Sequence, residues 1–191
     1  MSLRIIAGRH RGRRLRAPEG LATRPTSDRA REALFGILEH GLPPLRGSRF
    51  LDLFAGSGAA GLEALSRGAV EALLIDQASA AIAAIGANVA ALGEEARARV
   101  LRADACRLGQ APGTFDIVFL DPPYASGLLP AALEGLKARG WLAPGALIVG
   151  EIASREPLAP VAGFAVEDER RYGAARFVFL READAAGGAP G

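Results

Sequence analysis

The chain has 191 residues, half of them hydrophobic, and a formal net charge of +2. This length supports one globular domain with a full core, and no apolar run approaches the ~18 residues of a membrane span. The single cysteine, Cys106, excludes a disulfide framework and a cysteine zinc site. With no secretory signal visible at its start, we expect a cytoplasmic protein with no membrane partner.

The charge is unevenly spread. Residues 1–31 hold nine arginines against two acidic residues, giving +7, and the remainder holds 14 basic and 19 acidic side chains, giving −5. A basic segment on a mildly acidic body predicts a polyanionic partner, most simply nucleic acid. A solvated edge hairpin that limits aggregation by its charge is the alternative. The residues expected to bind RNA phosphates are Arg9, Arg11, Arg13, Arg14 and Arg24.

In chain order, the pattern predicts a hairpin, a helix and then alternating strands and helices. The hairpin has strands over 3–7 and 13–17 around a turn. The helix begins at Thr26 or Ser27 as its cap and ends near Glu39, before a linker over 41–47. After the linker we expect strands over 50–54, 73–75, 98–103, 115–120, 146–150, 165–169 and 176–181, and helices after the turn at 56–61, over 78–92 and over 128–139.

Repeated strand–helix units predict an α/β fold, a parallel sheet with helices on both faces. The expected organisation is an RNA-contacting extension over 1–46, a main domain over 47–182 and a disordered tail over 183–191.

The stretch FLDLFAGSGAAGLE, residues 50–63, reads as a strand, a glycine turn and a helix start. Gly56, Gly58 and Gly61 spell G-x-G-x-x-G, which suits dinucleotides and other adenosyl ligands alike. Asp52 favours S-adenosylmethionine, because this ligand carries a sulfonium and an ammonium but no phosphate. The alternative is that Asp52 only braces the turn, although a nearly buried carboxylate is costly without a partner.

Four predicted strands end in or next to an aspartate: Asp52, Asp76, Asp104 and Asp121. Ligands of open α/β sheets bind outside these strand ends, so the four carboxylates face one crevice. Asp76 has the spacing of a ribose acceptor, and Asp104 is a candidate acceptor for an adenine amine. We expect no metal, because neither histidine lies near these ends. The expected cofactor-binding residues are Asp52, Phe54, Ala55, Gly56, Ser57, Gly58, Asp76, Gln77, Asp104, Ala105 and Asp121.

The sharpest motif is Asp121-Pro122-Pro123-Tyr124, whose four residues are the candidate catalytic group. Two prolines fix the backbone and remove two N–H donors, which leaves acceptors beside an aromatic ring. This suits the exocyclic amine of a flat base: Tyr124 stacks on the base, while Asp121 and the Pro122 carbonyl accept its N–H groups. A rigid turn without further role is the alternative.

Together these motifs resemble class I S-adenosylmethionine-dependent methyltransferases acting on amino nitrogens. More narrowly, RIIAGRHRGRRLRAP, RPTSDRAREALFGIL, LDLFAGSGAAGLEALSRGA and DPPY resemble the bacterial 16S ribosomal RNA guanine-N2 methyltransferases (RsmD-like). The match covers residues 4 to about 141 and, more loosely, continues to 180. Its most family-specific part is 24–29, whereas DPPY alone also fits adenine-N6 methyltransferases of DNA or RNA.

The resemblance implies a Rossmann-like, seven-stranded, mostly parallel sheet with an antiparallel final strand. It implies methyl transfer from S-adenosylmethionine to N2 of a guanine in 16S RNA, within the small subunit or its assembly intermediate, by a monomer that needs no metal. Asp76 departs from the glutamate common in such enzymes, and Gln77 also differs. The rival functions are a nicotinamide oxidoreductase and a non-catalytic ribosome-assembly factor.

Overall fold

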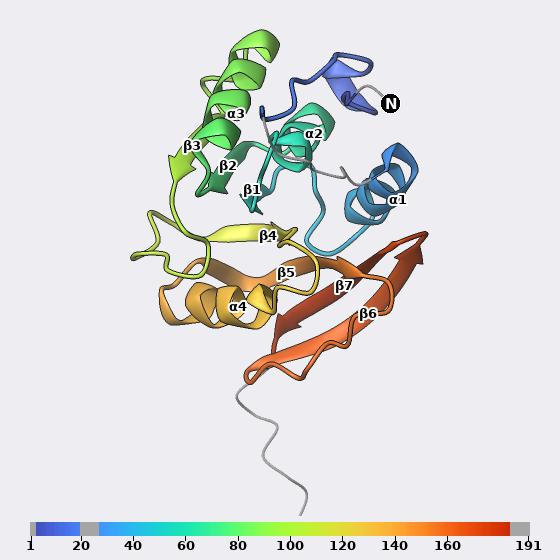
Figure 1. The fold of residues 1–191 in the computed structure, drawn as a ribbon, viewed down its shortest axis with the longest axis vertical. Helices are drawn as coiled ribbons and strands as arrows, with labels where there is room; N and C mark the ends of the chain where they lie inside the picture. The colour runs from blue at the N-terminus through green and yellow to red at the C-terminus, as the bar shows by residue number, and fades with distance from the viewer. Residues whose placement is uncertain (1–2, 20–26, 184–191) are drawn as a thin grey trace, which may run out of the picture.

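The computed structural model describes residues 3–19 and 27–183, and its centre is one seven-stranded sheet (Figure 1). The strand order is β3-β2-β1-β4-β5-β7-β6, with β7 antiparallel to both of its neighbours and the other pairs parallel. The expected sheet and its antiparallel final strand are therefore confirmed. The strands are β1 (Arg49–Leu53), β2 (Glu71–Asp76), β3 (Ala98–Arg102), β4 (Phe115–Leu120), β5 (Leu142–Ala153), β6 (Phe164–Tyr172) and β7 (Ala175–Glu182).

Helices cover both faces of the sheet. The chain builds β1, β2 and β3 outward in one direction and then crosses to β4 and β5 on the other side of β1. Because right-handed crossovers in opposite directions place their helices on opposite faces, α4 lies across the sheet from α2 and α3, and α1 packs on the same side as these two (Figure 1). The helices are α1 (Asp28–Glu39), α2 (Ala59–Arg67), α3 (Ser79–Leu92) and α4 (Leu128–Ala138).

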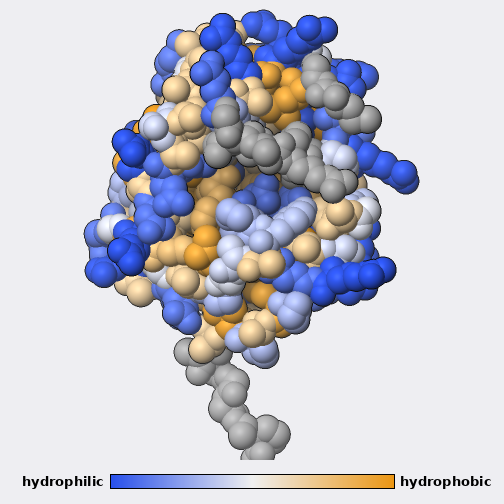
Figure 2. Space-filling model, viewed as in Figure 1, coloured by the Kyte–Doolittle hydropathy of each residue, from blue (hydrophilic) through white to orange (hydrophobic). Residues whose placement is uncertain are grey.

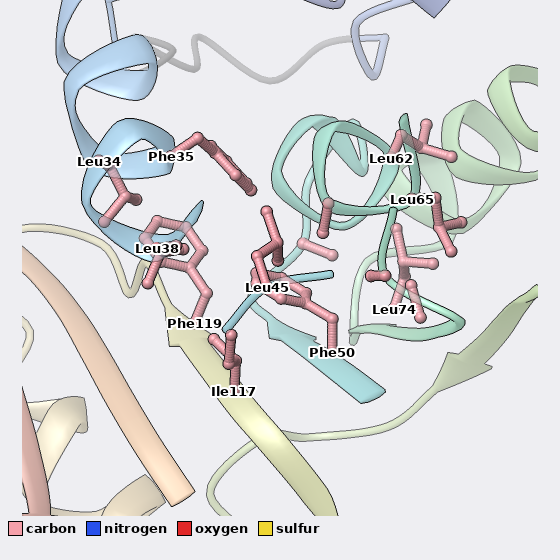
Figure 3. Packing of buried hydrophobic residues seen from close by; sticks show 14 of the residues in the cluster. Leu34, Phe35, Leu38, Leu45, Phe50, Leu62, Leu65, Leu74, Ile117 and Phe119 are labelled. Carbon is pink, nitrogen blue, oxygen red and sulfur yellow. The ribbon is translucent and has the colours of Figure 1, made fainter. Parts of the chain in front are cut away.

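The core consists of two layers, because successive strand residues point to opposite faces. In β1, Phe50 belongs to the cluster under α1, α2 and α3, whereas Leu51 belongs to the cluster under α4. Figure 3 shows the first cluster, where Phe35 of α1 stacks on Phe50 with ring centroids 6.2 Å apart. Leu45, within the expected linker, is fully buried in the same cluster. Helix α1 thus shares its core with the sheet.

Most predicted elements are present with small changes in their bounds. Ser27 caps α1 by accepting from the Ala30 amide at 3.2 Å, and Gly93, with a φ of 68°, ends α3. The main difference is β5, which extends beyond the predicted 146–150 in both directions, because it pairs with β7 up to Ala153 and with Phe115 of β4 at Leu142. No helix in the described part of the chain is long and apolar enough to cross a membrane.

The N-terminal segment, residues 3–19, is called the arm below, and it forms the expected hairpin, in which the Ile5 amide donates to the Arg13 carbonyl and the Leu15 amide to the Leu3 carbonyl, each at 2.9 Å. It holds one isolated bridge, Arg4 to Arg14, and a short 3-10 helix, Gly8–His10, instead of two regular strands. Other amides of the arm bond to side chains of the domain. Glu63 accepts from the amides of Ile6 and Ala7 at 2.7 and 2.9 Å.

Candidate active site

The glycine turn lies at the carboxyl end of β1, beside β4, where the strand order reverses. Phe54, Gly56 and Gly58 all have positive φ angles, of 61°, 55° and 77°. A Cβ atom on Gly58 would lie 2.8 Å from Leu74, so only glycine fits where the turn packs on β2.

Asp52 is buried beneath this turn. Its carboxylate accepts from the Gly61 amide at 2.8 Å, so it braces the start of α2. Burial raises its pKa to about 7, and the charge of Asp76 contributes in the same direction. A carboxylate destabilised in this way gains stability from a nearby cation, so bracing the turn and binding a cationic ligand are compatible roles.

The ribose candidate Asp76 is also occupied within the protein. Its two oxygens accept from the amides of Gly56 and Ala78 at 2.9 and 2.8 Å, and this ties the glycine turn to the end of β2. Each carboxylate oxygen has a second lone pair, so contact with a ribose hydroxyl remains compatible. Gln77 beside it is exposed.

The adenine candidate Asp104 follows β3 and is partly exposed. Its carboxylate accepts from the Cys106 amide at 2.9 Å. Ala105 between them is buried. The structure therefore brings Asp52, Asp76, Asp104 and Asp121 to the carboxyl edge of four adjacent strands, as expected.

Asp121 ends β4, next to a buried carboxylate that we did not predict. Leu120 pairs with Gly150 in the parallel β4–β5 ladder. The next residues of the two chains, Asp121 and Glu151, therefore lie side by side. Burial, then Glu151, then Asp52 raise the pKa of Asp121 well above its ordinary value. Burial and the neighbouring acidic groups therefore keep the Asp121 carboxyl protonated to a higher pH than an exposed aspartate.

The Tyr124 side chain connects the motif to Glu151. Its hydroxyl donates to Glu151 Oε1 at 3.1 Å, while the residue remains 44% exposed. The next residue, Ala125, has a φ of 56°, and Glu156 accepts from its amide and from that of Ala153. The loop after Pro123 is thus fixed, and the aromatic ring stays accessible.

A hollow of about 150 Å³ adjoins the motif on the β5 side. Its walls are mostly apolar, with Glu151 as one of the polar groups. They include Pro122, Pro123, Leu129, Ile152 and Leu158. In residues 3–19 and 27–183, no three His, Cys, Asp or Glu side chains gather to hold a metal ion.

Arginines of the arm lie on the outside of α2 and α3. Arg9 pairs with the buried Glu94, and Arg13 donates to the Ala91 carbonyl. Arg11 and Arg14 are exposed, whereas Arg24 lies outside the described residues. Figure 2 shows mostly hydrophilic residues at the top of the molecule, and in the same view Figure 1 places the arm and α3 there.

A buried asparagine joins the arm to the glycine turn. The Asn88 side chain accepts from the Arg16 amide at 2.7 Å and donates to the Arg16 and Ser57 carbonyls at 3.0 and 2.9 Å. Asn88 is 1% exposed. Sequence reasoning missed Asn88 and Glu63, because their partners lie far away along the chain.

Comparison with known proteins identifies a family for almost the whole chain. The family described as conserved hypothetical protein 95 matches residues 3–181. The ribosomal RNA small subunit methyltransferase D of Escherichia coli K12 is 40% identical over 185 residues, covering 95% of this chain and 91% of that protein. The putative rRNA methyltransferase YlbH of Bacillus subtilis is 39% identical over 153 residues, covering 78% and 82%.

Solved structures show the same fold. The putative methyltransferase yhhF of Escherichia coli superposes with a TM-score of 0.81 at 40% identity, covering 95% of this chain and 98% of that one. The sheet, its helices and this likeness establish the class I S-adenosylmethionine-dependent methyltransferase fold.

Proposed function

Because the chain belongs to the conserved hypothetical protein 95 (RsmD) family, we propose that it transfers a methyl group from S-adenosylmethionine to the exocyclic N2 amine of a guanine in small-subunit ribosomal RNA. The observation that carries this proposal is the position of Asp121–Tyr124. The motif lies at the strand-order reversal, next to the glycine turn and the buried Asp52. A nicotinamide oxidoreductase has no use for that motif.

The residues of the first half of the site fit the methyl donor. When bound, S-adenosylmethionine supplies an electrophilic methyl on a sulfonium. Asp52 faces the turn with a destabilised carboxylate that a cation relieves, and the glycines permit close approach. Asp76 and Asp104 would accept from the ribose and adenine. The other proposed contacts are Phe54, Ala55, Gly56, Ser57, Gly58, Gln77 and Ala105.

Asp121, Pro122 and Tyr124 would hold the target base. Tyr124 presents an accessible ring for stacking, while Asp121 and the Pro122 carbonyl accept the amine hydrogens. As the N–CH3 bond forms and the S–CH3 bond breaks, positive charge grows on nitrogen, and the carboxylate stabilises it. The electron pair of the broken bond stays on sulfur, and the nitrogen then loses one proton to the carboxylate or to water.

The substrate must present its guanine unstacked, because an amine within a base stack is out of reach. Exposed arginines of the arm, Arg11 and Arg14 above all, would bind the RNA phosphates around it. We propose that the natural substrate is the small subunit or its assembly intermediate, that the enzyme acts as a monomer, and that it works in the cytoplasm without a metal.

The test is methyl transfer in vitro to small ribosomal subunits from cells lacking this gene. Digestion of the RNA and mass analysis of its nucleosides should yield N2-methylguanosine, dependent on Asp121. N6-methyladenosine would instead support the adenine alternative. Binding of subunits without any methyl transfer would support the assembly-factor alternative.

A further inference from the structure

Glu151 is a buried carboxylate at the motif that the proposed mechanism does not use. It is 1% exposed, lies on β5 directly beside Asp121 in the ladder, and accepts the Tyr124 hydroxyl at 3.1 Å. Burying a carboxylate next to another acid destabilises the folded protein, and such costly arrangements are typical of functional sites. Glu151 therefore needs an explanation beyond packing.

We propose that Glu151 is the positioning residue of the motif: it fixes the Tyr124 ring through the hydroxyl and acts on Asp121 as its immediate electrostatic neighbour. This inference rests on the proposed function, because it concerns how Asp121–Tyr124 binds the target guanine. Glu151 acts through the other two residues, so it is not itself a catalytic residue.

The ring contact has a direct consequence for stacking. Tyr124 is 44% exposed, and without a tether such a side chain samples several rotamers. The bond to a buried acceptor on the central sheet selects one of them before the base arrives. Glu151 of β5 thereby fixes the orientation of the Tyr124 ring, while Glu156 fixes the backbone of Ala125 by accepting from its amide.

The charge contact has a separate consequence. The charged groups that act on Asp121 are Glu151 from β5 and Asp52 from β1, and both raise its pKa, as does burial. Removing the Glu151 charge must therefore lower that pKa. Because Asp121 accepts amine hydrogens as a carboxylate, activity declines as the pH falls through its pKa. Without the charge at 151, this decline occurs at lower pH.

Two variants separate the contacts. Glu151→Gln keeps an acceptor for the Tyr124 hydroxyl but removes the charge, so the acidic limb of the single-turnover rate profile should move to lower pH. Tyr124→Phe keeps the charge and loses the tether. It should leave the limb in place and lower kcat/KM about fivefold, the effect of one hydrogen bond. The matched control is Glu156→Gln, a carboxylate of the same hollow, which should not move the limb.

The measurement is single-turnover methyl transfer to small subunits from pH 5 to 9, together with carboxyl-carbon NMR titration of Asp121 in the full chain without RNA. The proposal is supported if the pKa of Asp121 is lower in Glu151→Gln than in the wild type and the acidic limb of the rate profile moves to lower pH with it. An unchanged pKa, or an equal change in Glu156→Gln, overturns it. If the wild type methylates no guanine, the proposed function fails, while the NMR titration still decides the electrostatic role.

Discussion

Replacing Asp52 by asparagine tests the donor site through protein stability. The substitution keeps an oxygen for the Gly61 amide and removes the charge. Burial raises the Asp52 pKa from 3.8 to about 7. The folded state thus binds this proton more tightly than the unfolded state, and stability falls as the pH rises from about 4 to about 7. At about 1.4 kcal/mol per pKa unit, the full loss is about 4 kcal/mol.

The asparagine variant should lack this loss. Between pH 5 and pH 8 its free energy of unfolding should rise relative to the wild type by roughly 2.5 kcal/mol. Urea unfolding of the ligand-free proteins at both pH values measures the difference. Removing this charge also lowers the pKa of Asp121, and this acts in the same direction.

The same variant should bind the methyl donor more weakly, although its stability falls less as the pH rises. Losing the buried charge beneath the turn should weaken the binding of S-adenosylmethionine by at least about tenfold, or 1.4 kcal/mol, in calorimetry. Equal pH dependence in both proteins would refute the buried-charge reasoning. Equal affinity would place the cationic ligand elsewhere.

Three further predictions concern the rest of the site. Asp121→Ala should lose about 2.7–4 kcal/mol of transition-state stabilisation in single-turnover transfer, with a smaller loss for Asp121→Asn; a wild-type rate would remove Asp121 from the mechanism. Neutralising Arg11 and Arg14 should reduce the salt slope of RNA binding by about 1–2 without changing donor affinity; an unaltered slope would make the arm structural only. Asn88→Ala should weaken donor binding in calorimetry, because the Ser57 carbonyl loses its donor; affinity equal to the wild type would show that the turn is held without it.

Local patterns were sufficient to predict the main parts of the site. The glycine turn and Asp121–Tyr124 are each continuous in sequence, and their place at strand ends follows from the repeated strand–helix order. Glu151 carries the same signal, a carboxylate directly after the predicted strand 146–150. The prediction considered only aspartates at strand ends and therefore missed Glu151, which in the structure lies inside β5.

The arm shows what local patterns miss. Its alternating apolar residues predict two strands, and Ile5 and Leu15 are indeed buried. Some of the backbone bonds join the two sides of the arm, but others go to Glu63 of α2 and Asn88 of α3, which are distant in sequence. Isolated polar residues within helical stretches give no sign of such partners. Contacts of this kind follow only from the three-dimensional packing.

The central claim is that the protein methylates a guanine of small-subunit RNA and that Asp121–Tyr124 binds this guanine during the reaction. Its most direct test is mass mapping of that RNA from cells lacking the gene, complemented with the wild-type chain or with Asp121→Ala. We predict one N2-methylguanine that is absent without the gene, restored by the wild type and not restored by Asp121→Ala. An identical methylation pattern in all three strains would contradict the account.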